Sequence, residues 1–127
     1  MKRIKPGHFL MKVPIYHVRL LVSFGEDAET IIKVLSNYHC PKSISQPIIE
    51  GYIEGAAGYY IDFNNTFYLL VTKNVPIILK DYSTLVHEIT HVSQAILENA
   101  GIQIRMETTE PLAYLAGYLY EEICKKL

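Results

Sequence analysis

The sequence lacks most of the features that would assign it to a nucleic-acid-binding, membrane-spanning or secreted class. Its 127 residues carry 12 basic and 13 acidic side chains, a formal charge of -1, so no overall attraction to nucleic acid or to an anionic membrane is expected. The longest candidate for a membrane span, 16–24, is far too short and contains His17 and Arg19. Residues 6–8 are Pro-Gly-His, where a signal peptide would need an apolar core. We therefore expect a cytoplasmic protein with no membrane or nucleic-acid partner.

Cysteine is also scarce, and the two that occur are far apart. Cys40 and Cys124 form no Cys-x-x-C pair, which argues against a disulfide framework or a thiolate metal site. We expect both thiols to be reduced. The alternative is that Cys40 is a catalytic nucleophile activated by His39. Side chains of adjacent residues rarely point toward each other, however, and Pro41 stiffens the segment.

Internal repeats and low-complexity tracts are absent, so we expect one domain that spans 1–127. Half of the residues are hydrophobic, which is enough for a real core. A domain of this size buries roughly two-thirds of the surface that its unfolded chain exposes. The sequence leaves the oligomeric state open.

Hydrophobic periodicity predicts an α+β fold with a small sheet of about three strands. Residues 15–24 alternate in the manner of a strand, and 27–38 repeat apolar residues at helical spacing. The strongest hairpin signal joins 58–63 to 66–72 through Asn64-Asn65, because asparagine tolerates positive φ.

Between these elements, 39–57 is the least decided region, because its prolines, serines and glycines favour loops. A short strand at 47–53 is the alternative. Further along, 82–99 reads as a helix capped by Asp81 or Ser83 and ended near Gly101, and 111–127 reads as a C-terminal helix.

The motif that organises the chain lies inside the first of these two helices, as His87-Glu88-Ile89-Thr90-His91. Histidines four residues apart lie one turn from each other on the same helix face, so both imidazoles can reach one metal ion. The plainer interpretation is a helix with two exposed histidines and a solvated glutamate.

A catalytic zinc site with two histidines needs a third protein ligand and an open position for water. Glu110 is the leading candidate, because Pro111 places it at the start of the C-terminal helix, which can pack antiparallel to the histidine helix. Glu98 lies roughly 10 Å further along the histidine helix and is too far away. Glu107 stays open on spacing alone.

The motif at 87–91, followed after eighteen residues by Glu110-x-x-Ala113-Tyr114, resembles the compact gluzincin-type zinc peptidases of phages and mobile elements. Their signature is HExxH followed by E-x-x-A-Y. The resemblance is strongest over 83–120 and implies a minimal zincin-like fold, in which the C-terminal helix carries the third ligand.

The resemblance also implies roles for individual residues. Zn²⁺ would be bound by His87, His91 and Glu110, and Glu88 would be the catalytic base. Larger gluzincins often have an acidic residue four positions after the ligand glutamate, where this chain has Tyr114. We interpret Tyr114 as a hydrogen-bond donor to a ligand or to the developing oxyanion, and an ordinary core tyrosine is the alternative.

These observations favour a zinc-dependent peptidase whose partner is a peptide or protein substrate, paired with an edge strand of the hairpin. Two alternatives remain. One is a catalytically silent zinc-binding domain of a phage or mobile element that acts as a binding or assembly module. The other is a regulatory protease for one specific partner.

Overall fold

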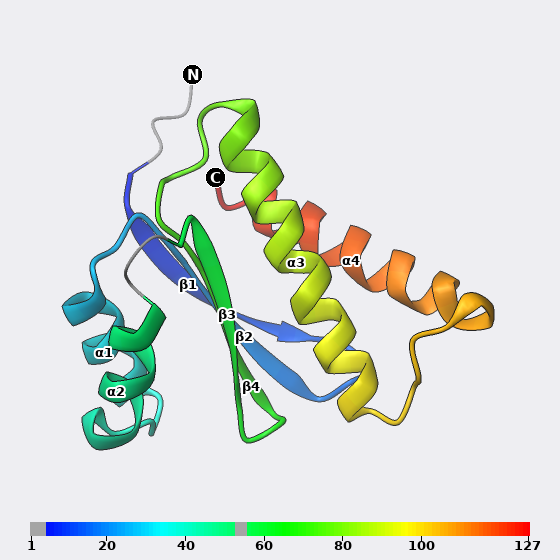
Figure 1. Cartoon of the computed structure of the whole chain (residues 1–127), viewed down its shortest axis with the longest axis horizontal. Coiled ribbons are helices and arrows are strands. Elements are labelled where there is room, and N and C mark those ends of the chain that lie inside the picture. Colours follow the sequence, from blue (N-terminus) through cyan, green and yellow to red (C-terminus); the bar gives the residue numbers. More distant parts are fainter. Residues whose placement is uncertain (1–4, 53–55) are drawn as a thin grey trace.

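The computed structural model describes residues 5–52 and 56–127. Within them the chain forms an α+β fold with four α-helices, one short 3₁₀ helix and a four-stranded mixed sheet (Figure 1). In chain order the elements are β1 (Gly7–Val13), β2 (Val18–Phe24), α1 (Ala28–Asn37), α2 (Lys42–Tyr52), β3 (Gly58–Phe63), β4 (Phe67–Thr72), α3 (Leu79–Asn99), η1 (Met106–Thr108) and α4 (Thr109–Cys124).

The strands lie in the order β1-β2-β4-β3. The outer pairs, β1 with β2 and β3 with β4, are antiparallel, and the central pair of β2 and β4 is parallel. Both central strands are buried on both faces, which explains why their sequences are nearly continuous runs of apolar residues. β3 is an edge strand, and one side of it has no strand neighbour among the described residues.

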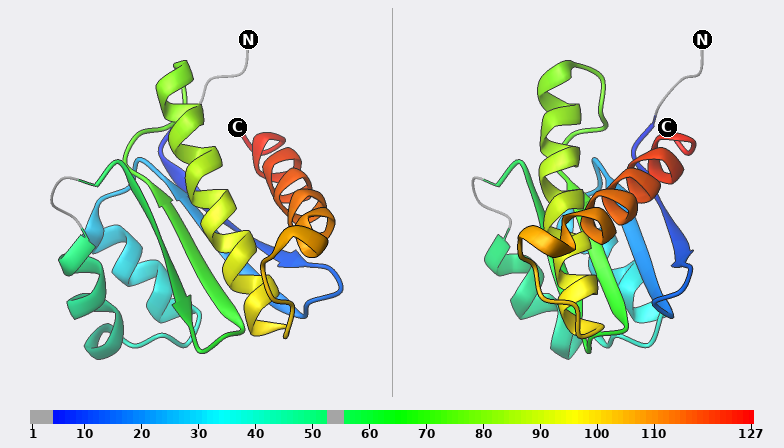
Figure 2. Two further views of the ribbon diagram at one scale, coloured as in Figure 1. Left: turned by 45° about the vertical axis from the view of Figure 1, so that its right-hand side comes forward. Right: turned by 90° about the vertical axis from the view of Figure 1, so that its right-hand side faces the viewer.

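Helices cover the two faces of the sheet in pairs, with α1 and α2 on one face and α3 and α4 on the other (Figure 2). Alternation along the strands divides the core accordingly. Leu20, Val22 and Leu70 point toward α3 and α4, whereas Leu21 and Leu69 point toward α1 and α2.

The hairpin is confirmed in type and position. β3 and β4 pair antiparallel, and Asn64 and Asn65 adopt φ values of 60° and 59° at the turn. The two predicted helices near the motif are also confirmed, although α3 begins at Leu79, three residues before the predicted start. The helix predicted over 27–38 is α1. Asp27 caps its start, because the Asp27 carboxylate accepts a hydrogen bond from the Thr30 N–H at 2.8 Å.

Two predictions about the fold are wrong. The sheet has four strands and not three, because 7–13 forms the edge strand β1. Within the segment 39–57, where a loop or a short strand at 47–53 is predicted, 42–52 forms α2 despite Pro47 in its interior, and 53–55 lie outside the described residues. Burial explains the second error: Ile49 is fully buried against α1 and the sheet, and this packing outweighs the hydrogen bond that proline cannot make.

Within the described part of the chain, no helix combines the length and the apolar character that crossing a membrane requires. The predicted strand at 15–24 is β2, which begins at Val18 and is paired on both sides.

Candidate active site

The helix α3 holds the motif in a fixed place because both of its ends are tied down. At its start the Asp81 carboxylate accepts hydrogen bonds from the backbone N–H groups of Ile77 and Ile78, at 3.1 and 3.3 Å, and these bonds lower the pKa of Asp81. Near its end the Asn99 amide donates to Asp62 of β3 at 2.8 Å. Gly101 then ends the helix with a φ of 88°.

The sheet-facing side of α3 explains why the motif points where it does. Leu85, Ile89, Val92 and Ile96 are buried against the sheet. The positions between them therefore turn His87, Glu88 and His91 toward the strand at the sheet edge, β3, and the solvent beside it.

The two imidazoles lie at the separation that one zinc ion requires. Their Nε2 atoms are 3.2 Å apart, and their ring centroids are 4.7 Å apart. Two nitrogens bound to one tetrahedral zinc at about 2.0–2.1 Å would lie about 3.3 Å from each other. The separation of the pair therefore matches that of two adjacent ligands of a tetrahedral metal ion.

Tyr60 on β3 holds one of these imidazoles in place. Its ring stacks on His91 with centroids 5.6 Å apart and an interplanar angle of 14°. Sequence reasoning missed this residue, because nothing in the sequence distinguishes it from the nine other tyrosines. The register of the hairpin, which puts Gly58, Tyr60 and Asp62 on the face of β3 that meets α3, is the signal that identifies it.

Glu88 is buried between α3 and β3, with only 5% of its surface exposed. This burial raises the pKa of its carboxyl group, and the nearby His87 and His91 oppose the rise. A buried carboxylate is costly, and one whose pKa is perturbed beside two histidines is a candidate for a functional group.

Gly58 makes room for this carboxylate. A Cβ at that position would lie 3.1 Å from Glu88 Cγ, 3.0 Å from Thr84 Cγ2 and 3.0 Å from the Val71 carbonyl oxygen. Only glycine allows α3 and β3 to approach so closely here. The sequence places this residue at the start of the predicted strand 58–63 but does not reveal its contact with Glu88.

An open groove runs along the outer edge of β3 past these residues. A hollow of about 350 Å³ between 57–58 and 83–88 joins another of about 460 Å³ along 58–62, and Gly58 and Glu88 line both. The Ala57 carbonyl accepts from the Lys73 N–H at 2.9 Å. Because bonded and non-bonded pairs alternate in an antiparallel ladder, the backbone polar groups of Gly58, Tyr60 and Asp62 point away from β4 toward this groove.

The structure does not bring the predicted carboxylate ligand to the histidine pair. Among residues 5–52 and 56–127, no group of three or more His, Cys, Asp or Glu side chains converges so that it could hold a metal ion. Glu110 lies in the first turn of α4, is exposed, and lines a different hollow of about 580 Å³ beside the β1–β2 turn at 13–16. The fit to zinc is therefore good for the two histidines and incomplete for the carboxylate, whose ligation stays a prediction.

Tyr114 lines the same hollow as Glu110 and is 76% exposed, so it is not a core tyrosine. Its predicted role as a hydrogen-bond donor is not tested by this position. Glu107, the candidate that spacing left open, instead lies 3.5 Å from the Arg105 guanidinium in an exposed ion pair.

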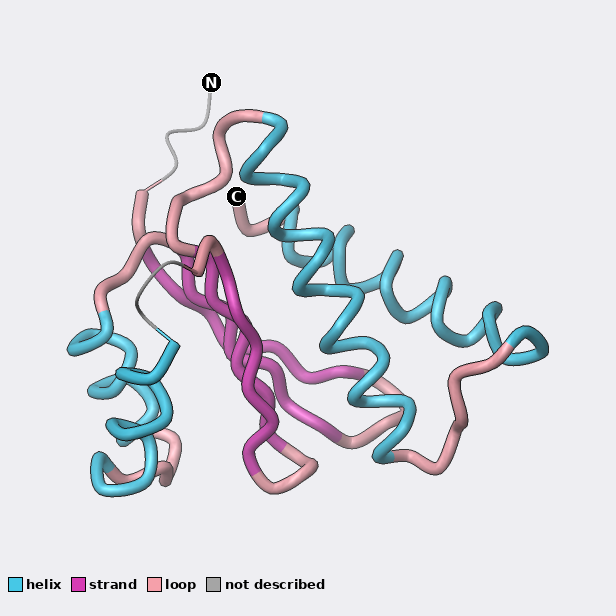
Figure 3. Tube along the Cα trace, in the orientation of Figure 1, coloured by secondary structure: helices cyan, strands magenta, loops and turns pink. Residues whose placement is uncertain are grey.

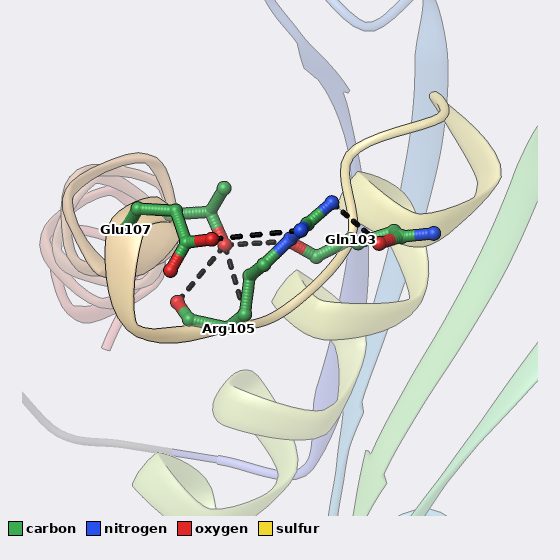
Figure 4. Close-up of polar contacts among 4 residues, drawn as sticks. Gln103, Arg105 and Glu107 are labelled. Carbon is green, nitrogen blue, oxygen red and sulfur yellow. Dashed lines mark hydrogen bonds and ion pairs between the residues drawn. The ribbon is translucent and has the colours of Figure 1, made fainter.

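The connection between α3 and α4 determines where Glu110 lies. It leaves the end of α3 as a long loop and reaches the start of α4 well to one side of the sheet (Figure 3). Within the loop, Arg105 Nη2 donates to Gln103 Oε1 at 2.6 Å, and the Arg105 N–H donates to Thr108 Oγ1 at 2.9 Å (Figure 4). These contacts are internal to the loop and exposed, so they organise it without fixing it to the histidine pair.

The cysteines show no sign of catalytic use. Both thiols are free, as expected. Burial raises the pKa of the Cys40 thiol, which lowers the fraction of reactive thiolate at neutral pH. The alternative of a Cys40 nucleophile therefore loses support.

Comparison with known proteins finds no family model that matches the chain, and no match among curated proteins or solved structures.

Proposed function

We propose that this chain is a zinc-dependent peptidase with a zincin-like fold, in which His87 and His91 bind the metal and Glu88 is the catalytic base. One observation carries the proposal: two imidazole nitrogens 3.2 Å apart and a buried carboxylate face the same groove beside an open strand edge. Glu110 remains the predicted third ligand. Its ligation requires the start of α4 to come closer to the histidine pair in the zinc-bound protein than it does here.

The substrate in this proposal is an extended peptide. An extended chain can add to the outer edge of β3 through main-chain hydrogen bonds with Gly58, Tyr60 and Asp62. Such pairing would place a peptide carbonyl beside Glu88 and the imidazoles, because Gly58 and Glu88 line the same stretch of groove.

Zinc, when bound, polarises the scissile carbonyl and lowers the pKa of a water molecule to about 7. Glu88 accepts the proton of the attacking water and returns it to the leaving amine. A raised pKa suits both steps, because a base that is too weak holds the proton poorly and one that is too strong does not release it. Tyr60 keeps the His91 ring oriented by stacking on it.

A second candidate is a zinc-binding module without catalysis. The separation of Glu110 from the histidine pair favours it, because two histidines alone bind zinc less completely than a three-ligand site does. The burial of Glu88 between α3 and β3 argues against it, since burying a carboxylate costs free energy and a purely structural zinc site does not need one there.

Hydrolysis of a library of randomised peptides tests the proposal, with zinc supplied and cleavage products read by mass spectrometry. The substitution Glu88→Gln should lower turnover by about 10²–10⁴-fold and leave zinc content unchanged. Glu98→Gln is the matched control, because Glu98 is an exposed glutamate on the same helix. Full activity in the Glu88 variant would refute its role. A native chain that binds zinc but cleaves nothing would favour the non-catalytic module.

A further inference from the structure

The groove beside β3 continues beyond the catalytic residues and becomes positively charged. A third hollow, of about 400 Å³, adjoins the one beside His87, and Ala57 and Thr84 line both. Lys73 and Lys80 line this third hollow. The three hollows together are called the edge groove below. They are lined by 56–62, 72–74, 78, 80–81, 83–84, 87–88 and 91.

The two lysines are available to a ligand. Both are exposed, and within the described part of the chain neither makes an ion pair. Asp81 also lines this hollow and stays charged, because hydrogen bonds from the backbone N–H groups of Ile77 and Ile78, together with the charge of Lys80, lower the pKa of its carboxyl group. Two positive charges against one negative charge leave the lysine end of the edge groove with a net positive charge.

The opposite end of the edge groove is negative. Asp62 lines it and is held by hydrogen bonds from the Asn65 N–H and the Asn99 amide, with no lysine or arginine paired to it among the described residues. The groove thus has opposite charges at its two ends, with Glu88 and the imidazoles between them.

The direction of β3 decides which end of a substrate meets which charge. A peptide that pairs antiparallel with β3, the more stable arrangement, runs from Asp62 toward Ala57. The residues that follow the cleaved bond would then enter the lysine end. Lys80 precedes Glu88 by eight residues, about 12 Å of helix. That distance corresponds to between three and four residues of extended peptide.

We propose that Lys73 and Lys80 select substrates that carry a carboxylate three to four residues on the C-terminal side of the cleaved bond. The carboxylate is that of an acidic side chain or of the peptide's own C-terminus. This inference rests on the proposed peptidase function, whose substrate class it names.

The test measures cleavage by the native chain and by Lys73→Glu/Lys80→Glu. Both proteins are first given the randomised library, and then matched peptides that carry Glu or Lys at the third and fourth positions after the cleaved bond. Glu peptides should be cleaved about 3–10 times more efficiently than Lys peptides, mainly through KM. The double variant should reverse this preference. Peptides with a free or amidated C-terminus distinguish the terminal carboxylate from a side chain.

The matched control is Lys33→Glu/Lys42→Glu, which makes the same change in net charge. These two lysines line a separate hollow between α1 and α2, on the other face of the sheet, so the preference should persist. Rising salt concentration should weaken the preference in the native chain, because the interacting charges are exposed.

Failure of the inference can be told apart from failure of the peptidase proposal. Cleavage without charge preference, or with the same preference in the double variant, would overturn the lysine assignment alone. If nothing is cleaved, fluorescence anisotropy still measures how tightly the same peptides bind to the edge groove of the Glu88→Gln variant. Tighter binding of Glu peptides that Lys73→Glu/Lys80→Glu abolishes would support recognition by the lysines, and equal binding would overturn it.

Discussion

The seam between α3 and β3 and the start of α4 differ in how firmly they hold their polar side chains. In the seam, Glu88 is 5% exposed, and His91 is stacked on Tyr60. At the start of α4, Glu110 and Tyr114 face solvent, and Tyr114 is 76% exposed. The first region packs its polar side chains against neighbouring residues, whereas the second exposes them to solvent.

The difference follows from the range of the interactions involved. The 3.2 Å separation of the imidazole nitrogens is a consequence of helical spacing within one turn of α3. The distance from Glu110 to that pair depends on the loop between α3 and α4, whose Ile102 and Ile104 pack against the core. The side-chain hydrogen bonds of this loop, such as Arg105 with Gln103, are internal to it. The proposed two-histidine site thus depends only on one helix, whereas the proposed third ligand depends on the position of a whole helix end.

The largest expected effect concerns Glu110. If zinc draws the start of α4 to the histidine pair, Glu110→Gln should weaken zinc binding by at least about 100-fold, because an anionic ligand is lost. Zinc should also slow hydrogen exchange at 102–112 in the native chain. Isothermal titration and exchange mass spectrometry measure the two effects.

The control for Glu110 is Glu107→Gln, which removes an exposed carboxylate that lies three residues earlier in the chain and pairs with Arg105. Unchanged zinc affinity in the Glu110 variant would contradict the assignment and leave the two histidines as the only protein ligands from this set.

The next effect compares a tyrosine of β3 with one of α4 as pH rises. Burial raises the pKa of Tyr59 to about 12, against an ordinary value of 10. The folded state therefore favours the neutral ring, and this contribution is complete below pH 10 and is lost as pH rises from 10 to 12. The loss should reach about 2–3 kcal/mol of unfolding free energy.

Denaturant unfolding of the native chain and of Tyr59→Phe across this range isolates the effect. Below pH 10 the free energies of unfolding of the variant and of the native chain should differ by a constant amount. Above pH 10 the variant should become more stable relative to the native chain. Tyr114→Phe, at an exposed ring, is the matched control. Curves for Tyr59→Phe and the native chain that stay parallel above pH 10 would contradict the buried environment of Tyr59.

The smallest effect contrasts two glycines. Gly58→Ala should destabilise the fold by about 1–3 kcal/mol, because the new methyl group meets the Val71 carbonyl, Thr84 and Glu88. Gly117→Ala should stabilise it by about 0.5–1 kcal/mol, because that site lies inside α4 with open space around it. Chemical denaturation measures both, and equal effects would mean that the seam is no tighter than the outer face of α4.

The elements that could be predicted are those whose signals are local. The hairpin followed from two β-rich runs around Asn64-Asn65, and α3 followed from the spacing of its apolar residues and from Asp81 and Gly101 at its ends. The closeness of the His87 and His91 imidazoles could be predicted for the same reason, since it depends only on their four-residue spacing in one helix.

The elements that could not be predicted depend on partners distant in sequence. The helix α2 contains Pro47 and forms because Ile49 is buried against α1 and the sheet, which no local pattern reveals. Edge strand β1 is mostly half-buried and lacks the strict alternation of a central strand. The roles of Gly58 and Tyr60 depend on β3 lying next to α3, so only the packed structure identifies them.

The central claim is that His87 and His91 form a metal site. Its most direct test is the zinc content, by mass spectrometry, of the untagged chain purified without chelators, compared with His91→Ala. His39→Asn serves as the control, because asparagine tolerates the positive φ at that loop position. We predict about one zinc per chain in the native protein and in the control, and none in His91→Ala. A native chain that takes up no zinc even when it is offered would contradict the account and leave the 87–91 motif as part of an ordinary helix.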